Sequence, residues 1–219
     1  MMQSSPKVTQ LDSLSVDFIE NRFLTPWDFG NEILYKLCAD YPHHSDDAII
    51  IAKTLFIGRI YAAAIERRRT KEGDLALGDT FYTETIVDAF KRSCIDDVFG
   101  KLANGEHKSI HMILEAHKTV VDILLEITGL EKRSFASKYL HFHFPYIFFI
   151  YDSRALSGIK KFIKKIPMQY SEFLDNRHVD LEYAKFYCKC HYLQCIVMNK
   201  YQKSPEKITP RIIDNMLLR

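Results

Sequence analysis

Residues 127–154 read ITGLEKRSFASKYLHFHFPYIFFIYDSR, two helical segments and an apolar run that ends in a carboxylate. Apolar residues recur at three- and four-residue steps from Ile110 up to Gly129, which predicts an amphipathic helix closed by a glycine. A tight basic turn follows, and 133–143 predicts a second helix that ends before a proline. The run YIFFIY then leads directly to Asp152. The pattern predicts a buried segment that holds one acidic side chain in place.

Helical spacing also dominates the remainder of the chain, and no segment of any length alternates with a period of two. Ser45 followed by two aspartates predicts a helix start, and Asp28 is expected to cap an earlier helix. Thr209 before Pro210 predicts the cap and first turn of a final helix. Further helices are expected at 48–69, at 80–103 with a break near Ser93, at 153–165 and at 179–201. The predicted fold class is therefore all-α.

The composition is that of an ordinary globular protein, with 47% hydrophobic and 26% charged residues. The longest apolar runs, at 48–52 and 146–151, are far too short to cross a bilayer, and the N-terminus lacks the pattern of a signal peptide. Five cysteines, an odd number without a disulfide pattern, favour a reducing compartment. We therefore expect a monomeric, cytoplasmic protein with no membrane partner.

Positive charge is concentrated in a few places although the net charge is only +2. The run RRRTK occupies 67–71 and the run KKFIKK occupies 160–165. Further cations near the end of the chain are Lys200, Lys203, Lys207 and Arg211. Such clusters can bind phosphates, and a solvated helix face is the equally weighted alternative.

The hairpin and the loop after it resemble the helix-hairpin-helix DNA glycosylases, the endonuclease-III-type superfamily. In that family a Leu-x-Gly-hydrophobic-Gly hairpin joins two helices, and an aspartate ends the hydrophobic stretch that follows. The matching positions are Ile127, Gly129 and Leu130 in the hairpin and Pro145, Ile150 and Asp152 in the loop. The resemblance implies one domain over 1–219, a two-lobed helical bundle with a cleft between the lobes. Its hairpin would lie at about 119–144 and its catalytic loop at about 145–154.

Two positions depart from the family's pattern. Glu131 stands where the hairpin has its second glycine, which lets backbone N–H groups approach a phosphate closely. Arg133, 19 residues before Asp152, stands where members that also cleave the strand have a nucleophilic lysine. A guanidinium is not deprotonated in proteins, so it cannot form the Schiff base. Lys132 and Lys138 lie near enough in the sequence to keep strand cleavage an open question.

The resemblance implies an enzyme that turns a damaged or modified base out of double-stranded DNA and hydrolyses its N-glycosidic bond, leaving an abasic site. Its role would be DNA repair or defence against foreign modified DNA. Asp152 would be the catalytic carboxylate, because a fixed negative charge stabilises an oxocarbenium-like sugar and can activate water. The residues expected to contact DNA are Gly129, Leu130, Lys132, Arg133, Lys138, Ser153 and Arg154. Weaker candidates for the base pocket are Arg59, Tyr61, His141 and Tyr151.

These assignments have structural alternatives. Asp152 can cap a helix that starts at Ser153, a role compatible with catalysis. Arg59 can equally make a structural ion pair within an apolar helix. The alternative function is a non-catalytic helical DNA-binding or protein-interaction module, which Glu131 in the hairpin favours.

No cofactor and no metal are expected. Cys188, Cys190 and Cys195 lack the spacing of the iron–sulfur cluster ligands found in some helix-hairpin-helix relatives. Cys188, His191 and Cys195 would share one face of a helix, but three ligands need a fourth from elsewhere. Buried free thiols within an aromatic stripe are the commoner explanation of such a pattern.

Overall fold

The computed structural model describes residues 26–66, 80–105, 108–174 and 177–219, and within these ranges the chain is helical, with no strand. This confirms the all-α fold class. Among the described residues, no helix is both long and apolar enough to cross a membrane. The helices are α2 Pro26–Asp40, α3 Asp47–Leu55, η2 Phe56–Ile60, η3 Phe81–Ile86, α4 Val87–Arg92, α5 Ile95–Asn104, α6 Ile110–Thr128, α7 Arg133–His143, α8 Ser153–Phe162, η4 Met168–Leu174, α9 Leu181–Tyr201 and α10 Pro210–Leu217.

Helices α6 and α7 form a helical hairpin, joined by the short segment 129–132. α6 begins where the Ser109 hydroxyl accepts the N–H of Met112, at 3.2 Å. It ends where Gly129 takes a left-handed conformation with a φ of 69° and donates its N–H to the Leu125 carbonyl, at 2.8 Å. Glycine adopts this conformation without a steric penalty, so the predicted closing glycine is confirmed. α7 then occupies 133–143, the range expected from the sequence.

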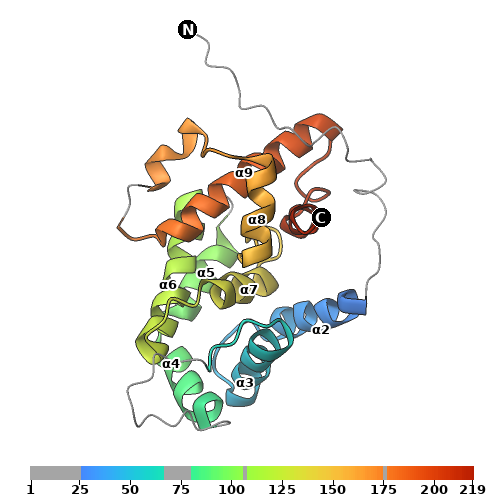
Figure 1. The fold of residues 1–219 in the computed structure, drawn as a ribbon. Coiled ribbons are helices and arrows are strands. Elements are labelled where there is room, and N and C mark those ends of the chain that lie inside the picture. The colour runs from blue at the N-terminus through green and yellow to red at the C-terminus, as the bar shows by residue number, and fades with distance from the viewer. Residues whose placement is uncertain (1–25, 67–79, 106–107, 175–176) are drawn as a thin grey trace.

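Helix α7 is the most enclosed part of the hairpin. Its eight residues from 135 to 142 are all buried, including the charged Lys138 and the imidazole of His141. Figure 1 shows α7 in the middle of the molecule, with α8, α9 and α10 above it and α2 and α3 below. A helix buried on all sides must satisfy each of its polar side chains internally. Lys138 and His141 therefore need hydrogen-bond partners from the elements packed around α7.

The prediction of one long helix at 48–69 is wrong. α3 ends at Leu55 and continues as the π-helical turn η2, in which Tyr61 donates its N–H to the carbonyl of Phe56 at 3.3 Å. The chain then leaves the helix, and Ala62 has a positive φ of 51°. The last part of the expected range, with the basic run at 67–71, lies outside the described residues.

Two lysines of the hairpin compensate for this early helix end. Lys138 donates from its Nζ to the Tyr61 carbonyl at 3.0 Å, and Lys132 donates to the Ala64 carbonyl at 3.1 Å. Carbonyls left without a helical partner are costly when they are shielded from water. The unwound segment is therefore held in place by side chains that lie about 70 residues further along the chain.

Two expected N-caps are shifted. Asp46, not Ser45, caps α3, and its carboxylate accepts the N–H of Ile49 at 3.1 Å. α2 already begins at Pro26, so Asp28 lies in the first turn of the helix and is not its cap. Both differences are within the usual uncertainty of helix starts, because several polar residues compete for the cap position.

The C-terminal helix packs tightly on α8. Thr209 caps α10 and Pro210 is its first residue, as the sequence predicts. α8 ends at Phe162, before the expected end at 165. A Cβ added to Gly158 of α8 would lie only 2.0 Å from the Leu217 carbonyl oxygen of α10. The absence of a side chain at this glycine lets the two helices approach closely.

Candidate functional site

Asp152 is held rigidly and remains accessible to solvent. Its carboxylate accepts the Ala155 N–H at 2.9 Å and so caps α8, and its side chain is 28% exposed. The run ahead of it is fixed by side chains, because the Ser137 hydroxyl accepts the Tyr151 N–H at 2.9 Å. The Tyr183 hydroxyl donates to the carbonyl of Phe149 at 3.0 Å. The capping role is therefore confirmed, and the catalytic role stays a prediction.

Lys138 lies beside Asp152. Its ammonium nitrogen is 3.9 Å from a carboxylate oxygen of Asp152, and it donates to the Tyr61 carbonyl and to the Ser134 hydroxyl at 3.0 and 3.3 Å. Burial lowers the pKa of Lys138, and the negative charges of Asp152 and Asp214 oppose that change. The lysine thus supplies a positive charge close to Asp152, in a position fixed by two hydrogen-bond acceptors.

Asp214 of α10 is a second carboxylate in this region, and sequence reasoning missed it. It is buried, and Arg211 donates to it at 2.8 Å. Burial raises the pKa of Asp214 to about 6, with a further rise caused by Asp152, while Arg211 and Lys138 act in the opposite direction. The available signal was an acid on the otherwise apolar inner face of the last helix. We define Lys138, Asp152, Arg211 and Asp214 as the charged cluster.

Arg133 and Lys132 are occupied by acceptors within the protein. Arg133 donates from Nε to both carboxylate oxygens of Asp180, each at 2.8 Å, and from Nη2 to Glu131 at 2.6 Å. Lys132 donates to Ala64, as described above. Asp180 also caps α9, so the Arg133 ion pair ties the start of α7 to the start of α9. Contact of these cations with DNA stays a prediction, and each has a structural role beside it.

The four candidates for the base pocket do not lie together. Tyr61 lies next to the charged cluster through its carbonyl, and its hydroxyl donates to Asn31 at 2.5 Å. Arg59 lies elsewhere, in an ion pair with Glu66 at 3.0 Å, which is the structural alternative considered for it.

His141 is fully buried, and Tyr151, the last residue of the apolar run, is partly buried against the core. The Nδ1 of His141 donates to the Phe148 carbonyl at 2.7 Å, because a carbonyl only accepts, so Nε2 accepts the Tyr35 hydroxyl at 2.6 Å. Burial lowers the pKa of His141 to about 4, so this histidine is neutral at pH 7. The Tyr151 ring packs edge-on against Phe186, with the centroids 5.3 Å apart.

Ser153 and Arg154 are both exposed, next to the capping carboxylate. Gly129 and Leu130 lie in the turn between α6 and α7. Contact of these residues with DNA stays a prediction.

The cysteines of α9 lie near a histidine that already has a hydrogen-bond partner. His191 hydrogen-bonds through Nδ1 to the Tyr170 hydroxyl at 2.7 Å, and within the described ranges no three His, Cys, Asp or Glu residues are grouped to hold a metal ion.

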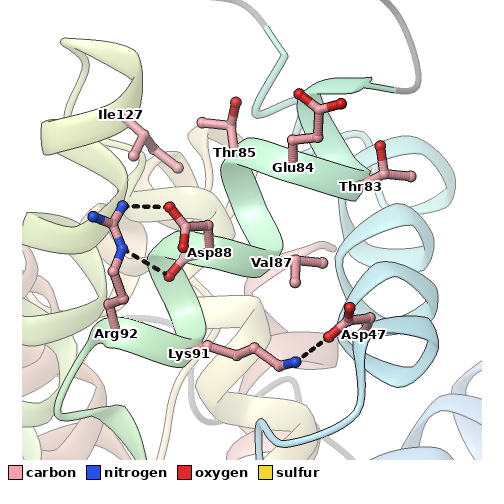
Figure 2. Close-up of a pocket in the computed structure, with 9 residues that line it drawn as sticks. All are labelled: Asp47, Thr83, Glu84, Thr85, Val87, Asp88, Lys91, Arg92 and Ile127. Carbon is pink, nitrogen blue, oxygen red and sulfur yellow. Dashed lines mark hydrogen bonds and ion pairs between the residues drawn. The ribbon is translucent and has the colours of Figure 1, made fainter.

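A surface depression lies away from Asp152, at the C-terminal end of α6. It has a volume of about 560 Å³ and lies among α3, η3, α4 and the end of α6 (Figure 2). Its cations are neutralised locally, because Lys91 pairs with Asp47 and Arg92 pairs with Asp88 at 2.7 Å. A second depression of about 350 Å³ lies between α5 and α6. Asp152 is not among the described residues that line either depression.

The chain was compared with family models, curated proteins and solved structures, and none of these matches it. The resemblance to helix-hairpin-helix glycosylases therefore depends on the residues of the hairpin and the loop alone. What it implies for function is accordingly a proposal, supported by the geometry around Asp152.

Proposed function

We propose that this protein is a DNA N-glycosylase that removes a damaged or modified base, with Asp152 as its catalytic carboxylate. The observation that supports this most directly is the state of that side chain. Its carboxylate is fixed by the Ala155 N–H and lies 3.9 Å from the ammonium of Lys138, yet the side chain is 28% exposed. A structural cap needs the first property only. A carboxylate that acts on a substrate needs accessibility as well.

The chemistry assigned to Asp152 is electrostatic. As the bond from the base to C1′ breaks, the bonding electrons leave with the base and the sugar acquires oxocarbenium character. A fixed carboxylate stabilises this positive charge and accepts a proton from the water that adds to C1′. The ammonium of Lys138 lies 3.9 Å from this carboxylate and is the nearest cation that pairs with it among the described residues.

The expected product is an abasic site in an intact strand. Arg133 is held in its double ion pair and cannot act as an amine nucleophile. The amine of Lys138 is buried and donates to two oxygens of the protein, with a carboxylate nearby. We therefore expect base release without efficient cleavage of the strand.

The test is a screen of duplex oligonucleotides with different lesions and modified bases, followed by alkali to reveal abasic sites. We expect wild type to release at least one such base. The variant Asp152→Asn should lose activity about 100-fold or more, because its neutral amide cannot stabilise the sugar cation. The matched control is Asp46→Asn, which changes the cap of α3 in the same way and should leave base release unchanged.

The alternative, a non-catalytic DNA-binding or protein-interaction module, is favoured by a specific observation. Lys132 and Arg133 already have acceptors within the protein, and Asp152 does not line either of the two depressions described. In that case wild type would release no base from any member of the screen, and Asp152→Asn would affect only the stability of α8.

A further inference from the structure

Helix α8 has an exposed face that carries cations near both of its ends. Arg154, Lys160 and Lys161 are exposed on α8, and Lys164 and Lys165 are exposed just after its end. The opposite face, with Ala155 and Ile159 among its residues, is buried. The α8 basic face is defined as Arg154, Lys160, Lys161, Lys164 and Lys165. It contains the four lysines of the KKFIKK run and begins two residues after Asp152.

The cations of the α8 basic face are not neutralised by the protein. None of the five makes an ion pair with any described residue. Four lysines elsewhere on the described surface do have carboxylate partners. Such pairs are Lys36 with Asp40, Lys91 with Asp47, Lys118 with Asp122 and Lys185 with Glu182. Positive charge is therefore concentrated on α8 without local compensation, which favours an external anion as its partner.

A lysine from α9 extends this positive field. Lys189 donates from its Nζ to the carbonyl of Lys164 at 3.1 Å. Burial lowers the pKa of Lys189, and the positive charge of Lys160 lowers it further. The positive charges of these lysines repel one another, and an anion bound among them would reduce that repulsion. This observation comes from α9 and is independent of the exposure of the α8 side chains.

We propose that the α8 basic face binds the sugar–phosphate backbone of duplex DNA beside the nucleotide on which Asp152 acts. The proposal rests on the proposed function. The cations of the hairpin turn have acceptors within the protein, whereas those of the α8 basic face have none among the described residues. Backbone contacts by lysine and arginine supply most of the affinity for DNA without selecting a sequence.

The length of α8 suits such a role. Ten residues extend for about 15 Å, which matches the rise of about four base pairs. The helix starts directly after Asp152, so its basic face continues from the candidate carboxylate. A membrane surface fits less well, because the other exposed residues of α8 are the small polar Ser153 and Ser157, whereas membrane-surface helices present large apolar side chains.

The test replaces the lysines of the α8 basic face by glutamine in K160Q/K161Q/K164Q/K165Q. The control K36Q/K91Q/K101Q/K118Q removes the same number of exposed or ion-paired lysines from other helices. Binding to an undamaged duplex is followed by fluorescence anisotropy between about 50 and 200 mM salt. Each lost phosphate contact flattens the slope of log Kd against log salt by about 0.9. We expect the α8 variant to flatten it by about three, and the control by less than about one.

The outcomes separate this inference from the proposed function. An α8 variant that binds duplex with the wild-type Kd and salt slope overturns the inference and leaves the role of Asp152 intact. Loss of binding in the α8 variant, together with unchanged base release by Asp152→Asn, supports the inference and rejects the catalytic role of Asp152. Wild type that binds phosphatidylserine vesicles but no duplex rejects both. If the quadruple variant fails to fold, the pairs K160Q/K161Q and K164Q/K165Q give the same comparison with half the effect.

Discussion

Asp152 combines two demands on one side chain, a fixed position and access to solvent. The Ala155 N–H fixes its orientation, and Lys138 provides a nearby positive charge. Asp214 adds a second negative charge from α10, and its pKa is raised to about 6, chiefly by burial. At the residue scale, Lys138 is therefore placed between two carboxylates, and its removal affects both.

Lys138→Met should lower the free energy of unfolding by about 3 kcal/mol, because it removes the cation from a largely buried group of charges and leaves the Tyr61 carbonyl without its donor. Urea denaturation measures this change. Lys118→Met removes a more exposed pair with Asp122 and should cost less than about 1 kcal/mol. Equal losses in the two variants would contradict the role given to Lys138.

Asp214 predicts a specific dependence of stability on pH. Its folded pKa of about 6 is above its value of about 3.9 in the unfolded chain, so the folded state binds the extra proton. The resulting stabilisation is complete below about pH 4 and is lost as pH rises through about 6. The loss is on the order of 2–3 kcal/mol.

Asp214→Asn should remove that loss. The difference in unfolding free energy between wild type and Asp214→Asn is measured at a series of pH values, because other carboxylates such as Asp180 have lowered pKa values and contribute with the opposite sign. We expect wild type to lose stability relative to the variant between about pH 4 and 6. If the difference in unfolding free energy stays constant with pH, the pKa of Asp214 is not raised in the folded protein.

At the element scale, the close contact of α8 with α10 brings Asp214 toward Asp152. The contact depends on Gly158, where a Cβ would lie 2.0 Å from the backbone of Leu217. Backbone atoms cannot move aside as the end of a flexible side chain can. The distance between the two helices is therefore set by the size of this one residue.

Gly158→Ala should destabilise the protein by about 1–3 kcal/mol, because the added methyl group forces α8 and α10 apart. The matched control is Gly100→Ala in α5, where an added Cβ meets nothing within 4 Å. That variant should gain about 0.5–1 kcal/mol, since alanine is the better helix former. Thermal unfolding of the two variants and of wild type measures these changes. A Gly158→Ala variant that is more stable than wild type would contradict the close contact of α8 with α10.

Local signals in the sequence predict some elements well and others poorly. The range of α7, the closing Gly129 of α6 and the Thr209 cap of α10 were all predictable, because each depends on residues within a few positions. The early end of α3 was not, since the carbonyls freed there are bound by Lys132 and Lys138, 68 and 77 residues distant from their acceptors.

In the candidate site, too, the sequence predicts what depends on neighbouring residues and not what depends on distant ones. Asp152 stands out in the sequence because it ends an apolar run, and its capping role follows from its neighbours. Its approach to Lys138 and Asp214 depends on how α7, α8 and α10 pack, which no single segment reveals. The pairing of Arg133 with Asp180 is likewise set by the packing of α9 against the hairpin.

At the scale of the whole molecule, the described cations of the hairpin turn and those of the α8 basic face differ in their partners. The hairpin cations tie α7 to α9 and to the segment after η2, and the cations of the α8 basic face remain available for an external anion. The carboxylate of Asp152 lies where these two regions meet, at the start of α8. This arrangement suits a protein that binds a polyanion along one helix and acts on it at the end of that helix.

The most direct test of the catalytic role of Asp152 is a single-turnover rate of base release, measured with enzyme in excess over the best substrate from the screen. The account predicts that Asp152→Asn binds that duplex with the wild-type Kd and releases the base about 100-fold more slowly or worse. Equal rates for the two proteins at saturating enzyme would contradict it.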